Sequence, residues 1–142
     1  MRAFRIAIGL ILVAGLGLAA TPEEESRFLN AVHDAYAKKD KDAIIALYCW
    51  DGVEPQYRAM FPNLLNFQIS EREITSVYFR TNFVPTVIPQ TNNGVVYVPN
   101  LTPTKQLVIE HKVDPDGMHD TLRLDIGEKD GKLMIANQIP RP

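Results

Sequence analysis

The spacing of the apolar residues changes near residue 70, and this change constrains the fold more than any other feature of the sequence. Before it, apolar side chains recur every three or four residues, as on one face of a helix. After it, apolar and polar residues alternate, as along a strand with one covered face. Helices that all precede the strands predict an α+β fold, with N-terminal helices packed on one face of a curved antiparallel sheet.

Start and stop signals predict three helices in the first half. The first begins at the N-cap Thr21 and ends at the polar run 38–41. The second is capped by Asp40 and stops at Gly52. The third contains Pro62, which removes a backbone donor and clashes with the preceding turn. A kink or two short helices are therefore expected there.

Two hairpin turns organise the alternating half, at 92–94 and at Asp130-Gly131. With Asp130-Gly131 as a two-residue loop, Ile126 faces Ile135 and Leu124 faces Asn137. The face turned toward the helices is expected to carry Leu107, Ile109, Leu122, Leu124, Ile126, Leu133 and Ile135. The wet face is expected to carry Val108, Glu110, Arg123 and Asp125, with Glu110 and Arg123 as a cross-strand ion pair.

The first 19 residues have the order of a secretory signal peptide. A basic start with two arginines precedes an apolar run over 6–18 that ends in small residues. Cleavage after Ala19 would leave 20–142 as a single α+β domain in a periplasmic or secreted location. The run has 13 residues, fewer than the roughly 20 that span a membrane. The membrane becomes a partner only in the alternative that the signal stays uncleaved.

Charge and motif content exclude several classes of partner. The chain without its signal has 13 basic and 17 acidic residues, scattered with no basic face, so nucleic acid is not expected. Cys49 is the only cysteine, which rules out an internal disulfide and predicts a buried, small apolar side chain. Neither a metal-ligand spacing nor a cofactor fingerprint occurs, so we expect no metal and no cofactor.

Several stretches within residues 26–53 carry a family resemblance: Phe28 to Val32, Ala35-Tyr36, Lys39 to Tyr48 and Tyr48-Cys49-Trp50-Asp51-Gly52-Val53. Together they resemble the helical opening of the nuclear-transport-factor-2-like (cystatin-like cone) superfamily. The resemblance implies a helical hairpin and a third helix against a curved sheet that encloses a pocket. Ketosteroid isomerases, polyketide cyclases and many non-enzymatic domains share that fold, and a domain of unassigned function has a similar second-helix end. No catalytic acid or histidine of the family matches a position here, and the strand pair that commonly precedes the third helix is missing.

Five polar side chains are candidates for a binding site. Alternation places His111 and Asn137 on the covered face, where a histidine could act as general acid or base. The alternative for His111 is a place at the rim of the sheet, bonded to a backbone carbonyl. Tyr36, Tyr48 and Tyr57 could direct hydroxyls into the same cavity, or serve as core residues.

These observations leave three functions open. The first is a non-enzymatic exported module that binds a small apolar ligand or a partner protein. The second is a small acid–base enzyme, of isomerase or dehydratase type, with His111 as its catalytic candidate. The third is a structural or dimerisation module whose open sheet face or edge pairs with a second copy.

Overall fold

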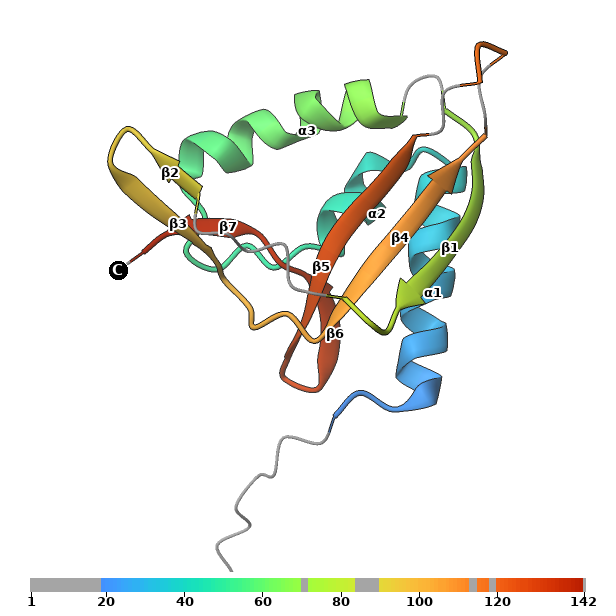
Figure 1. Ribbon diagram of the computed structural model, residues 1–142, viewed down its shortest axis with the longest axis horizontal. Helices are drawn as coiled ribbons and strands as arrows, with labels where there is room; N and C mark the ends of the chain where they lie inside the picture. The colour runs from blue at the N-terminus through green and yellow to red at the C-terminus, as the bar shows by residue number, and fades with distance from the viewer. Residues whose placement is uncertain (1–18, 70–71, 84–89, 113–114, 118–119, 142) are drawn as a thin grey trace, which may run out of the picture.

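The computed structural model describes residues 19–69, 72–83, 90–112, 115–117 and 120–141. Its helices and strands form the α+β fold that the sequence predicts, with a strongly curled antiparallel sheet (Figure 1). The expected signal segment lies outside the described residues up to residue 18. The helices are α1 (Pro22–Ala37), α2 (Lys41–Ala46) and α3 (Pro55–Ile69). The strands are β1 (Ile74–Arg80), β2 (Gln90–Asn92), β3 (Val95–Pro99), β4 (Lys105–His111), β5 (Thr121–Lys129), β6 (Lys132–Ile135) and β7 (Gln138–Pro140).

The strands form two antiparallel sheets. The larger has the order β1-β4-β5-β6, and the smaller has the order β2-β3-β7. Two tight turns follow the sequence prediction: Asn93 and Gly94 between β2 and β3, and Asp130 and Gly131 between β5 and β6, all have positive φ. Such turns match the twist of the strands that they join.

Helix starts also follow the sequence. The Thr21 hydroxyl accepts a hydrogen bond from the Glu24 amide at 3.2 Å, and the Asp40 carboxylate accepts from the Ala43 amide at 3.0 Å. These caps satisfy amides that have no partner inside a helix. Helix α1 then packs on β1 and β6 and covers one face of the larger sheet (Figure 1).

The covered face of the larger sheet carries the residues that alternation predicts, and Ile126 lies opposite Ile135 as predicted. Leu107 lies opposite Leu124, and Ile109 lies opposite Leu122. Leu122 and Leu124 are half-buried, whereas the other five predicted members are buried: Leu107, Ile109, Ile126, Leu133 and Ile135. These five join the buried residues of the helices in one apolar core.

The opposite face of the larger sheet is less exposed to solvent than the alternation predicts. Val108 is buried, because its neighbours across the sheet are the long side chains of Tyr78 and Arg123. The salt bridges of the described residues do not include the expected pair of Glu110 with Arg123. The carboxylate of Glu110 accepts hydrogen bonds from the Ser76 hydroxyl at 2.7 Å and the Tyr78 hydroxyl at 2.9 Å.

Helix α2 is shorter than expected, ending at Ala46 rather than near Gly52. After Ala46 the backbone forms hydrogen bonds with β6 instead of continuing the helix. The Leu47 carbonyl accepts from the Ile135 amide, and the Cys49 amide donates to the Ile135 carbonyl, each at 2.8 Å. Cys49 is buried, as predicted.

The predicted pairing of Leu124 with Asn137 is wrong. The β5–β6 ladder ends at Ile126 and Ile135, and the chain then crosses to the smaller sheet as β7. Asn137 is held there by Asn100, whose side-chain oxygen accepts from the Asn137 backbone amide at 2.8 Å and whose backbone amide donates to the Asn137 carbonyl at 2.8 Å. Side-chain bonding that no periodicity encodes therefore redirects the last strand.

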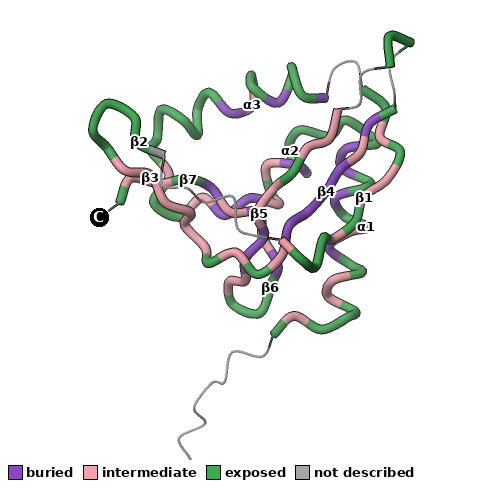
Figure 2. Tube along the Cα trace, in the orientation of Figure 1, coloured by how far each residue is buried: buried purple, intermediate pink, exposed green. Residues whose placement is uncertain are grey.

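Helix α3 continues through Pro62 as one helix (Figure 1), so of the two expected outcomes, a kink or two short helices, the second is wrong. Phe61, just before the proline, and Leu65, three residues after it, are both buried, so both halves of the helix are anchored in the core. Ile69 at the end of α3 is also buried, whereas most of the other residues of the helix are exposed, as Figure 2 shows. Its exposed large apolar side chains are Tyr57, Met60, Leu64 and Phe67.

Within the described part of the chain, no helix is long and apolar enough to cross a membrane.

Candidate functional site

A cleft of about 540 Å³ lies between α3, the smaller sheet and the end of the β5–β6 layer. Helix α3 supplies one wall, and Asn92 and Tyr97 from β2 and β3 supply another. The cleft volume lies within the range of small-molecule sites in proteins. Its lining consists of Tyr48, Val53, Glu54, Tyr57, Phe61, Gln68, Asn92, Tyr97, Leu124, Ala136, Asn137 and Gln138.

Tyrosine hydroxyls and side-chain amides supply most of the polar groups in this lining. Burial raises the pKa of Tyr48 well above its usual 10, and the neighbouring Tyr36 and Tyr57 raise it further. Burial also raises the pKa of Tyr57. Both hydroxyls are therefore protonated and neutral at physiological pH, and both can donate hydrogen bonds. Among the described lining residues, Glu54 alone carries a charged side chain.

Tyr36 lies beside Tyr48 but does not line the cleft. Its hydroxyl is buried, and burial raises its pKa to about 12, an effect that the Tyr48 hydroxyl partly offsets. The two hydroxyls interact without the geometry of a formed hydrogen bond. Among the described residues, the Tyr36 hydroxyl is the buried side-chain polar atom that lacks a partner. A buried unpaired hydroxyl costs about 1–3 kcal/mol.

An aromatic cluster forms the floor of the cleft. The Tyr48 and Phe61 rings meet edge to face with centroids 4.8 Å apart, and Trp50 packs against Phe61 at 5.0 Å. The indole nitrogen of Trp50 donates to the Ile45 carbonyl at 2.9 Å. Trp50 therefore lies directly behind two residues of the cleft lining.

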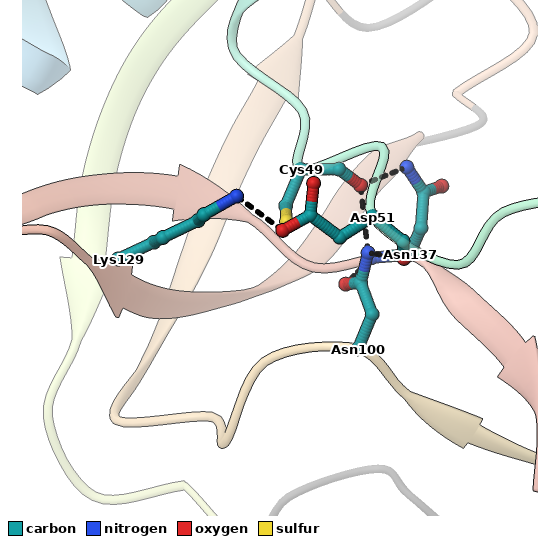
Figure 3. A network of polar contacts seen from close by, with 5 residues as sticks. All are labelled: Cys49, Asp51, Asn100, Lys129 and Asn137. Atoms are coloured by element: carbon teal, nitrogen blue, oxygen red, sulfur yellow. Dashed lines mark hydrogen bonds and ion pairs between the residues drawn. The ribbon is translucent and has the colours of Figure 1, made fainter. Parts of the chain in front are cut away.

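Asn137 lies in the cleft wall and also belongs to a structural network (Figure 3). Its side-chain nitrogen donates to the Cys49 carbonyl at 2.8 Å. The side chain of Asn100 donates to the same carbonyl at 2.8 Å and to the Asp51 carbonyl at 3.0 Å. Lys129 and Asp51 form an ion pair beside them. These bonds give the Asn137 side-chain nitrogen a partner within the protein, and they fix the wall of the cleft.

His111 lies away from this cleft. Its Nδ1 and its backbone amide each contact the Asp120 carbonyl at 3.2 Å. Because a carbonyl only accepts, Nδ1 carries the proton of the neutral ring. Burial lowers the pKa of His111, and Arg72 lowers it further. Ala136 in the cleft wall donates its amide to the Asp125 carbonyl, and Asp125 lies five residues after Asp120, the contact of His111. Five residues of a strand span about 17 Å, so His111 lies far from the cleft.

Of the five predicted site residues, the structure therefore brings together Tyr48, Tyr57 and Asn137. Tyr36 lies behind Tyr48, and His111 lies at the far end of the larger sheet. Sequence reasoning missed Tyr97, Gln68 and Asn92. Tyr97 has the one usable signal, an aromatic residue in a short predicted strand, but its position depends on the second sheet.

A second cleft, also of about 540 Å³, opens on the other side of the strand ends. Leu124, Ala136 and Gln138 line both clefts. The second one is more charged, with Arg80, Arg123 and Asp125 in its lining. Burial raises the pKa of Asp125, and a hydrogen bond with the Gln106 side chain partly offsets this.

The described residues contain no group of three or more histidine, cysteine, aspartate or glutamate side chains that could hold a metal ion. Comparison with protein-family models and with curated proteins gives no match for this chain.

Proposed function

We propose that this protein is an exported, non-enzymatic binding module that holds a small apolar ligand in the cleft beneath α3. The observation that carries the proposal is the composition of that cleft. Four aromatic rings, Tyr48, Tyr57, Phe61 and Tyr97, surround a space of about 540 Å³ with several amide and hydroxyl groups. Apolar walls with a few placed polar groups are typical of small-molecule sites.

The electrostatics narrow the class of ligand. The Tyr48 and Tyr57 hydroxyls are neutral donors, and the lining contains no lysine, arginine or histidine among the described residues. We therefore expect an uncharged, flat or aliphatic ligand with a hydrogen-bond acceptor. The distance of His111 from the cleft favours binding over an acid–base reaction there. The resemblance to nuclear-transport-factor-2-like proteins also supports this proposal, because that superfamily has its pocket between helices and sheet.

Trp50 provides a direct test. It is the only tryptophan of the chain, and its ring packs against Tyr48 and Phe61. Titration with N-phenyl-1-naphthylamine, an uncharged apolar probe, should quench Trp50 emission saturably as energy passes to the probe. A probe that leaves Trp50 emission unchanged would count against the cleft as an apolar site.

Two tyrosines of equal exposure make a matched pair for this titration. Tyr57 is 41% exposed and lines the cleft, whereas Tyr78 is 42% exposed and lies on the opposite face of the sheet. Tyr57→Ala should weaken probe binding about tenfold, which corresponds to about 1.4 kcal/mol. Tyr78→Ala should leave binding unchanged. Equal effects of the two variants would contradict the proposed location.

A further inference from the structure

The contact between Ala20 and Glu128 joins the beginning of the described chain to the sheet. The backbone nitrogen of Ala20 donates to Glu128 Oε1 at 3.1 Å, across 108 positions in the sequence. Ala20 is half-buried and packs against the apolar core, whereas Ala19 is exposed. The carboxylate thus points at the first residue of the chain that signal cleavage would leave.

Cleavage would change the chemistry of this contact. In the intact chain the Ala20 nitrogen is a neutral amide. A signal-type peptidase would add water across the Ala19–Ala20 peptide bond, leaving a carboxylate on Ala19 and an α-ammonium group on Ala20. The ammonium has three N–H donors and a positive charge, and it would lie at hydrogen-bond distance from a carboxylate.

The neighbouring charges leave Glu128 available for this role. On α1, Glu24 pairs with Arg27 at 2.9 Å, and Glu25 pairs with Lys105 of β4 at 2.7 Å. Glu128 forms no ion pair with lysine, arginine or histidine among the described residues. Next to it on β5, Lys129 pairs with Asp51. Within the described part of the chain, the hydrogen-bond partner of the Glu128 side chain is the Ala20 nitrogen.

We propose that Glu128 binds the α-ammonium group of Ala20 in the mature protein and thereby anchors the start of α1 to the sheet. Two independent observations meet at this position. The small residues Gly17 and Ala19 place the cleavage site in the sequence, and the fold places a carboxylate on the nitrogen that cleavage would release. The inference rests on the proposed export and is independent of ligand binding in the cleft.

The first measurement is the mass of the exported protein, which should correspond to a chain that begins at Ala20. A different first residue would overturn the proposal. The second is the pKa of the Ala20 amino group, followed by NMR in the protein that begins at Ala20. It should lie above the ordinary value of about 8 by about half a unit, about threefold in proton affinity. Glu128→Gln should return it to about 8.

A four-protein comparison separates the ion pair from general stability. The chain that begins at Ala20 and the same chain with one added glycine before Ala20 are each made with Glu128 and with Glu128→Gln. We expect the glycine to lower the thermal midpoint when Glu128 is present and to have little effect with Glu128→Gln. Equal effects in both backgrounds would overturn the proposal.

Glu23→Gln, which removes a carboxylate from the first turn of α1, is the control and should preserve the glycine effect. Quenching of Trp50 by the naphthylamine probe should be the same in all four proteins. Failure of the ion-pair proposal would therefore leave the proposal of ligand binding in the cleft untouched, and the reverse also holds.

Discussion

The side-chain amide of Asn137 donates to the carbonyl oxygen of Cys49, and this bond joins residues 88 positions apart. It ties the link between β6 and β7 to the segment that follows α2. Asn100 donates to the same oxygen from a third segment, so one carbonyl connects three parts of the chain (Figure 3). The network positions the wall that separates the two clefts.

Removing either amide should destabilise the protein. Asn137→Ala deprives the Cys49 carbonyl of one donor and should lower the free energy of unfolding by about 1–3 kcal/mol, with Asn100→Ala of similar size. Because the two share an acceptor, the double variant should deviate from additivity by about 0.5 kcal/mol or more. Asn66→Ala, on the exposed side of α3, is the control and should change stability by less than about 0.5 kcal/mol. Urea denaturation measures all four, and strict additivity would show that the amides act separately.

Gly127→Ala should be among the most disruptive small substitutions. A Cβ at this position would lie 2.6 Å from the Leu101 Cβ and 2.9 Å from the Thr102 carbonyl oxygen. Relief requires movement of the backbone, and we expect a loss of about 1–3 kcal/mol in thermal or urea unfolding. Gly94→Ala meets no atom within 4 Å and has only the cost of its positive φ, about 1–2 kcal/mol. A Gly127→Ala variant as stable as the native protein would mean that residues 101–102 do not cover β5.

His111 should make stability depend on pH in the acidic range. Its pKa in the folded protein is lowered by burial and by Arg72, whereas in the unfolded chain it takes the ordinary value of 6.5. Below pH 6.5 the unfolded chain therefore binds the proton more readily, and stability falls as the pH falls. His111→Asn should reduce the loss of stability between pH 7 and pH 5, measured by urea denaturation. Asn66→Ala, which changes no titratable group, should leave that loss unchanged, and an unchanged loss in both would contradict the assignment.

Adjacent leucines in α3 should respond very differently to truncation. Leu65 is fully buried, whereas Leu64 is 38% exposed. Leu65→Ala should cost about 2–5 kcal/mol of unfolding free energy, since it leaves a cavity in the core. Leu64→Ala should cost less than about 1 kcal/mol. Similar losses would mean that another molecule or segment covers the outer side of α3.

The sequence predicts the elements with local signals. The caps at Thr21 and Asp40 and the turns at Asn93-Gly94 and Asp130-Gly131 depend on side chains a few positions apart. The covered face of the larger sheet follows from alternation, because a strand turns successive side chains to opposite faces. These signals were enough to predict the α+β class and the buried face.

Long-range bonding accounts for what the sequence did not predict. The pairing of Cys49 with Ile135 ends α2 early, and the bonds of Asn100 to Asn137 divert β7 to a second sheet. The candidate cleft depends on that second sheet, so Tyr97 could not be assigned to it in advance. Alternation placed His111 and Asn137 on one face but could not show how far apart they lie along the sheet.

The packing of α1 on β6 also fixes the order in which the chain can fold. The helix is made first, and the strand that completes its burial is among the last segments of the sequence. Until residues 132–135 are available, Val32 and its neighbours lack part of the surface that covers them. Contacts between such distant segments require closing a long loop before they contribute stability. A growing chain of this sequence therefore cannot fully bury this face of α1 before residues 132–135 have been made.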